Sequence, residues 1–97
     1  MTSPAKISAD VLARYAADAA RDVAGVRRLV PDRLRRHGGV RVKDEGDVEI
    51  EVHLGINAGV SIPAVGRDLQ QRIVDYLERM TGTKPSAVDV VVHEIGD

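Results

Sequence analysis

Two histidines are the residues of this 97-residue chain that could bind a metal ion. His53 follows Glu51 by two positions and His93 follows Asp89 by four, each within a segment of alternating apolar residues. Two imidazoles and a carboxylate can hold zinc. However, the two segments are separate and neither contains a compact ligand motif. We therefore predict no metal site, and we interpret both histidines as solvent-facing residues of strands.

A second candidate is the stretch NAGVSIPAVG, residues 57–66, where two glycines and a serine precede a helix-like run. Such a loop could cradle a phosphate, but a dinucleotide site needs G-x-G-x-x-G and a P-loop needs Lys followed by Ser or Thr. Neither pattern is present. We predict a structural turn, in which Gly59 redirects the chain, Ser61 caps the helix and Pro63 sets its first turn.

Nucleophilic catalysis is not indicated. The chain has no cysteine, and its serines lie at the terminus, at predicted helix caps or at a strand start, without a nucleophile elbow; they are Ser3, Ser8, Ser61 and Ser86. We predict that the protein is not an enzyme and uses no cofactor.

The strongest surface feature is a cluster of arginines in residues 26–39, where Asp32 is the one acidic residue. Guanidinium groups pair with phosphates in a forked geometry, in lipid head groups or in nucleic acid. An alternative is that these arginines pair with acidic residues of the chain itself. The candidate anionic-surface contact consists of Arg27, Arg28, Arg33, Arg35 and Arg36.

Two helices are predicted, one before residue 26 and one after residue 61. The first begins at Ser8 and ends at Gly25, with an apolar stripe and, beside it, a stripe of alanines that suits close packing. The second begins at about Ile62 and ends at Gly82. Its expected inward residues are Val65, Leu69, Ile73, Leu77 and Met80, and its expected ion pairs are Asp68 with Arg72 and Asp75 with Arg79.

Alternation predicts three strands. Residues 40–43 and 48–56 form a β-hairpin around a connection at 44–47, and residues 87–95 form the last strand. Pro31 breaks residues 26–39 into a short turn or helical fragment. The predicted fold is α+β in the order α-β-β-α-β, a three-stranded sheet with two helices packed on one face. Residues 1–6 are predicted to be an N-terminal tail and residues 7–97 a single small domain.

Composition narrows the class of protein. Residues 1–43 carry ten basic and four acidic residues, and residues 44–97 carry four and eleven, within a net charge of -1. Such asymmetry favours an anionic partner for one half or association of unlike surfaces. Tyr15 and Tyr76 are the only aromatic residues, which disfavours a base-stacking surface. With no signal peptide and no membrane-spanning run of residues, the chain is expected to be cytoplasmic.

Several stretches together resemble the alkaline shock protein family, the envelope stress response proteins of Gram-positive bacteria. The order and spacing of these stretches carry the resemblance from Ile7 to about Ile95. They are Ile7-Ser8, residues 23–26 (VAGV), residues 59–62 (GVSI), Leu69-Gln70, residues 80–82 (MTG) and residues 88–92 (VDVVV).

The resemblance implies a non-catalytic envelope stress response protein that self-assembles as a homo-oligomer and acts as a scaffold. It would lie peripheral to the inner face of the cell membrane, held by a small integral membrane anchor protein, with an anionic lipid surface as a further contact. The alternative is a KH-like nucleic-acid-binding module that uses the arginine-rich loop. We do not expect nucleic acid as a partner, because the GxxG loop of that fold is missing.

Overall fold

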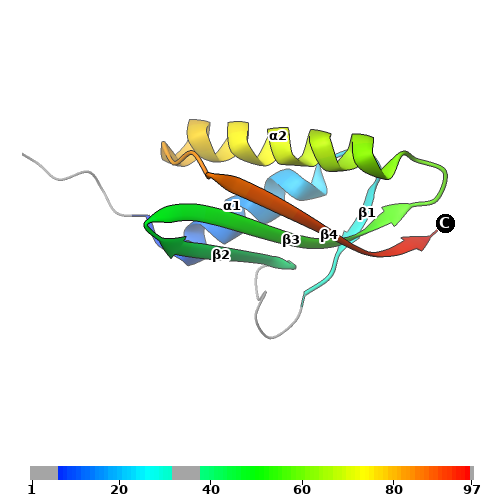
Figure 1. Ribbon diagram of the computed structural model, residues 1–97, viewed down its shortest axis with the longest axis horizontal. Helices are drawn as coiled ribbons and strands as arrows, with labels where there is room; N and C mark the ends of the chain where they lie inside the picture. Colours follow the sequence, from blue (N-terminus) through cyan, green and yellow to red (C-terminus); the bar gives the residue numbers. More distant parts are fainter. Residues whose placement is uncertain (1–6, 32–37, 97) are drawn as a thin grey trace, which may run out of the picture.

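The computed structural model describes residues 7–31 and 38–96, which form two helices and four strands (Figure 1). In chain order the elements are α1 (Ala9–Arg21), β1 (Val26–Leu29), β2 (Val40–Glu45), β3 (Asp47–Asn57), α2 (Ile62–Thr81) and β4 (Ala87–Gly96). Both helices lie on the same side of the sheet. The predicted α+β class and the helix layer are therefore confirmed, but the order is α-β-β-β-α-β.

The first helix begins as its sequence predicts. Ser8 is the N-cap, and its side chain accepts a hydrogen bond from the Val11 amide over 3.2 Å. Leu12, Ala16 and Ala20 are buried, so the alanines bring the helix close to its neighbours. The predicted end at Gly25 is wrong: α1 ends at Arg21 with Asp22 as the C-cap. Gly25 instead forms the turn into β1, with a φ of 95°.

The second helix has the predicted ends and nearly the predicted buried face. Its buried residues are Val65, Leu69, Ile73 and Leu77, and Gly82 terminates it in the left-handed conformation with a φ of 74°. The prediction for Met80 is wrong, because its exposed fraction is 47%. The buried stripe advances in steps of four, so its next position is Thr81.

Strand β3 is the centre of the sheet. It pairs antiparallel with β1 and β2 and parallel with β4, so the sheet is mixed. Residues 54–56 of β3 have partners on both β1 and β4, and residues 49–52 have partners on both β2 and β4. Since a strand has two edges, β1 and β2 must follow one another along the same edge. The sheet is thus three strands wide but contains four strands.

Strand β1 corrects the prediction of a turn or helical fragment at its position. The four residues Val26–Leu29 include two arginines and show no alternating burial. They are held extended by pairing with Leu54, Gly55 and Ile56, far along the chain. The predicted hairpin connection at residues 44–47 is also too long, because β2 and β3 continue to Gly46, whose φ is 91°.

One hydrophobic core lies between the helices and the sheet. From β3 it takes Ile50, Val52, Leu54 and Ile56, all at most 1% exposed. The opposite face of the sheet has no helix over it among the described elements (Figure 1). The predicted tail, residues 1–6, lies outside the described residues. A single domain over residues 7–97 stays a prediction.

Candidate functional site

The part of the arginine cluster beyond β1 is bounded by two residues that bond to the same residue of β3. The Val30 amide donates to the carbonyl oxygen of His53 over 2.8 Å, and the His53 amide donates to the carbonyl oxygen of Gly39 over 2.9 Å. A side chain on Gly39 would lie 2.9 Å from the backbone nitrogen of Val30, and φ at Gly39 is 86°. Val30 and Gly39, on either side of residues 32–37, therefore meet the sheet at the same residue of β3.

Of the five arginines proposed as an anionic contact, the structure describes two. Arg27 and Arg28 lie on β1, both exposed, whereas Arg33, Arg35 and Arg36 lie outside the described residues. Arg28 is already engaged. Its Nε donates to the Glu94 carboxylate of β4 over 2.5 Å, which is the intramolecular pairing that sequence analysis left open as an alternative.

This ion pair crosses β3 above a glycine. Arg28, Gly55 and Glu94 are register partners on β1, β3 and β4. A Cβ at Gly55 would lie 2.7 Å from both Cγ and Oε1 of Glu94, so the missing side chain gives the carboxylate its path. The hydrogen bond from Arg28 lowers the pKa of the Glu94 carboxyl below its usual value and raises the pKa of Arg28.

Two bulges shape the same region. The register between β1 and β3 skips Arg27, and the register between β3 and β4 skips His93, on opposite edges of β3. A bulge re-aims side chains next to it. At the β4 bulge His93 lies against His53, and Glu94 reaches across Gly55.

His53 and His93 are in contact, as a metal site would require, but their ring nitrogens face each other and a carboxylate. Nδ1 of His53 lies 2.5 Å from Nε2 of His93, and Nε2 of His53 lies 2.5 Å from Oε1 of Glu51. If the ionised carboxylate accepts from Nε2–H, then Nδ1 of a neutral His53 accepts from Nε2–H of His93. This is a row of hydrogen bonds. Within residues 7–31 and 38–96, no group of three or more histidines and acidic residues could hold a metal ion.

The expectation that His53 faces solvent is wrong. Its exposed fraction is 8%, and it is the one polar or charged residue among the buried residues of the described chain. Its burial follows from its neighbours, because Glu51 and His93 bond to its two ring nitrogens. His93 is exposed, as predicted.

The predicted turn between β3 and α2 contains a glycine with a positive φ, a serine cap and a proline. Gly59 has a φ of 86°, and nothing lies within 4 Å of a Cβ built there, so backbone conformation and not space favours glycine. The Ser61 side chain accepts from the Ala64 amide over 3.3 Å, and Pro63 lies in the first turn of α2. The Ser61 side chain thus satisfies a backbone amide in the first turn of α2.

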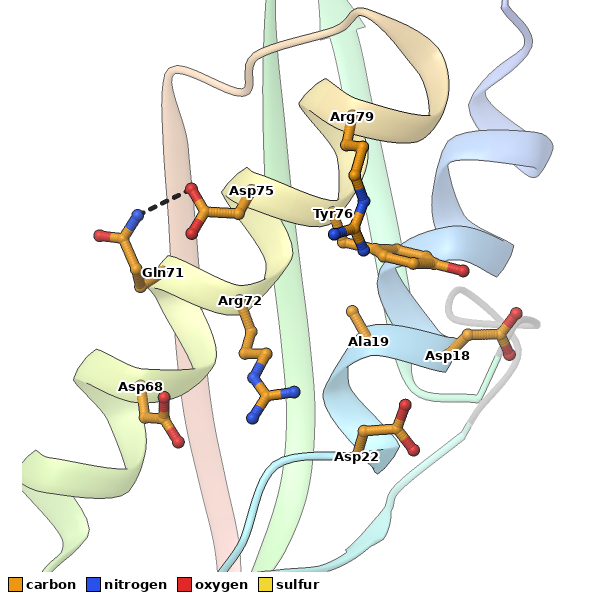
Figure 2. A pocket seen from close by; sticks show the side chains of 9 residues that line it. All are labelled: Asp18, Ala19, Asp22, Asp68, Gln71, Arg72, Asp75, Tyr76 and Arg79. Carbon is orange, nitrogen blue, oxygen red and sulfur yellow. Dashed lines mark hydrogen bonds between the residues drawn. The ribbon is translucent and has the colours of Figure 1, made fainter.

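A shallow groove between the two helices was not foreseen (Figure 2). Its volume is about 420 Å³. The Arg79 guanidinium lies 5.5 Å from the centre of the Tyr76 ring, which meets Tyr15 edge-to-face at 5.8 Å. Asp75 accepts from Gln71 over 2.9 Å, so neither member of the predicted Asp75–Arg79 pair lies in the expected contact. The other lining residues are Asp18, Ala19, Asp22, Asp68 and Arg72.

The positions of the two tyrosines were the one feature of the sequence that could have indicated contact between the helices beside this groove. Tyr15 lies on the apolar stripe of the first helix, and Tyr76 precedes the buried Leu77. Their contact depends on the packing of α1 against α2, which periodicity does not specify. The groove is lined by four carboxylates and two guanidinium groups and has no single sign of charge.

Comparison with known protein families identifies the family of this chain. A family model described by a cell envelope-related function matches residues 2–96. The chain belongs to the alkaline shock protein family. The resemblance inferred from residues 7–95 is thus confirmed, and the family carries a cell envelope-related function. No curated protein and no solved structure matches the chain. None of the helices in the described part is long and apolar enough to cross a membrane.

Proposed function

We propose that this protein is a non-catalytic scaffold of the envelope stress response. It self-assembles at the inner face of the cell membrane and is held there by a small integral membrane protein. Membership of a family with a cell envelope-related function supports the location. The observation that carries the scaffold role is the one-sided architecture (Figure 1), in which both helices cover one face and no described element covers the other face or the outer edge of β4.

Attraction to anionic lipid is the second part of the proposal. Val30 and Gly39, on either side of residues 32–37, both bond to His53, so the two described ends of this part of the cluster lie at one place on the sheet. Because Arg28 is paired with Glu94, we assign the lipid contact chiefly to Arg27, Arg33, Arg35 and Arg36. Each basic residue near an anionic surface contributes about 1 kcal/mol of attraction, which salt screens.

A cross-linked pull-down of tagged protein from its native host tests the scaffold role. The expected result is enrichment of one small integral membrane protein, together with a mass in light scattering that rises with concentration. Enrichment of RNA without a membrane protein would instead support the nucleic-acid alternative. A monomeric mass over a wide concentration range, with no membrane protein enriched, would contradict the scaffold.

Vesicle flotation tests the lipid contact separately. The protein should float with vesicles rich in phosphatidylglycerol and remain behind with phosphatidylcholine vesicles. Arg35→Glu with Arg36→Glu should abolish flotation. The matched control is Arg14→Glu with Arg67→Glu, which reverses the same number of charges at exposed positions of the helices. Equal loss in both double variants would show a response to net charge and not to the cluster.

A further inference from the structure

The outer edge of β4 is the longest free edge of the sheet. This ten-residue strand pairs with β3 along one side, and no other strand of residues 7–31 and 38–96 pairs along its second side. A free edge presents unsatisfied amides and carbonyls, which invite another strand. Its exposed residues include Val91 and Ile95, with exposed fractions of 37% and 59%.

The backbone directions along β4 decide which residues could meet another strand. On β3, the amide and carbonyl of His53 bond to residues on the edge shared by β1 and β2, so the amide and carbonyl of its register partner Val91 must point to β3. Backbone groups alternate in direction along a strand, so the amides and carbonyls of Val90 and Val92 point outward.

Residues 89–93 are complementary to themselves when the strand is reversed, because the outward backbone groups of Val90 in each copy can then bond to those of Val92 in the other. In an antiparallel pair of two β4 strands centred on Val91, the Val91 residues face each other and Asp89 of each copy faces His93 of the other. The side chains of Asp89, Val91 and His93 lie on the open face, so facing residues can touch. On the helix face, the half-buried Val90 would meet Val92 of the second copy. Apolar and opposite-charge pairs across strands stabilise such ladders.

We propose that a second copy of this chain pairs with β4, antiparallel and centred on Val91, to make one continuous sheet across a two-fold axis. The pairing is isologous, as expected of a two-fold interface. His93 Nε2 is directed to His53, which leaves Nδ1 of the ring to bond Asp89 of the second copy. This inference rests on the proposed self-assembly and names the surface that carries it.

Single-cysteine cross-linking tests the register, since the chain has no cysteine of its own. Facing residues of a non-hydrogen-bonded antiparallel pair have Cα atoms about 4.5 Å apart, at the short end of the range for a disulfide. Val91→Cys should therefore give covalent dimers under mild oxidation. The matched control is Val11→Cys on α1, because Val11 has an exposed fraction of 38%. It should give few dimers.

The outcomes separate this inference from the proposed function. If the wild-type protein self-associates but Val91→Cys cross-links no faster than Val11→Cys, the β4 pairing is wrong while self-assembly stands. A wild-type protein that stays monomeric at every concentration overturns both. Preferential cross-linking at position 91 supports both.

Charge exchange tests the Asp89–His93 contact. Asp89→Lys replaces two attractive cross-strand pairs with two repulsive ones and should weaken dimerisation about tenfold or more. Adding His93→Asp to that variant should restore dimerisation, because each Lys then faces a carboxylate. Dimerisation that is unchanged by Asp89→Lys, or lost in both variants, would contradict the register centred on Val91.

Discussion

The two faces of β3 are formed by alternate residues of one strand but are stabilised by different interactions. On the helix face, Ile50, Val52, Leu54 and Ile56 are buried among aliphatic side chains. On the open face, Glu51, His53 and Gly55 belong to a row of polar contacts that takes partners from β1 and β4. Packing tolerates many aliphatic neighbours, whereas the polar contacts need particular partners at particular places.

The largest expected effect is on the helix face. Leu54→Ala removes a fully buried side chain and should lower the free energy of unfolding by about 2–5 kcal/mol, through lost burial and a residual cavity. Chemical denaturation followed by circular dichroism measures this loss. Lys43→Thr, at an exposed position of β2, is the control and should change stability by less than about 0.5 kcal/mol. Similar losses in both variants would contradict the assignment of faces.

An intermediate effect is expected at Gly55. Gly55→Ala places a methyl group 2.7 Å from Cγ and Oε1 of Glu94, and forcing that side chain aside should cost about 1–3 kcal/mol. The cost should largely disappear when the same change is made in a Glu94→Ala background. A double-mutant cycle by denaturation provides the measurement. Costs that are equal in the two backgrounds would show that Gly55 is needed for some other reason.

The smallest effect is expected from the ion pair on the open face. Arg28→Gln should raise the pKa of Glu94 toward its usual value, and Arg27→Gln should raise it less, because the hydrogen bond comes from Arg28. Carboxyl carbon chemical shifts during a pH titration would measure both. Equal pKa values of Glu94 in the two variants would contradict the hydrogen-bonded geometry.

The pH dependence of stability follows from the same pair. Glu94 has a lowered pKa in the folded protein, so its contribution is present above the pKa of the unfolded chain. It is lost as pH falls through the folded pKa. The stability difference between wild type and Arg28→Gln should therefore be present at neutral pH and vanish in acid.

Much of the fold could be predicted, because it depends on local patterns. The capping residues Ser8 and Ser61, the exit at Gly82 and the alternation of residues 48–56 each specify their element without distant partners. Strand β1 could not be predicted, since its short charged sequence has little strand preference of its own. Its extended form comes from pairing with Leu54 and Ile56.

For the candidate site, the sequence predicted which residues could take part but not how they are arranged. The sequence showed two histidines near acidic residues, an arginine cluster and a glycine-serine-proline turn. The burial of His53, the passage of Glu94 over Gly55 and the bond to Arg28 depend on the parallel register of β3 and β4 and on a bulge at His93. A shift of that register by one residue would turn these side chains to the other face.

By itself, the sequence determined the α+β class, both helices, the hairpin, the last strand and the family, because periodicity, caps and the order of short stretches are properties of the chain. Only the tertiary structure decided that β1 and β2 share one edge, that His53 is buried and that no described strand pairs with the outer edge of β4. These features arise from contacts between residues far apart in the chain, and such contacts form only when the strands have found their register.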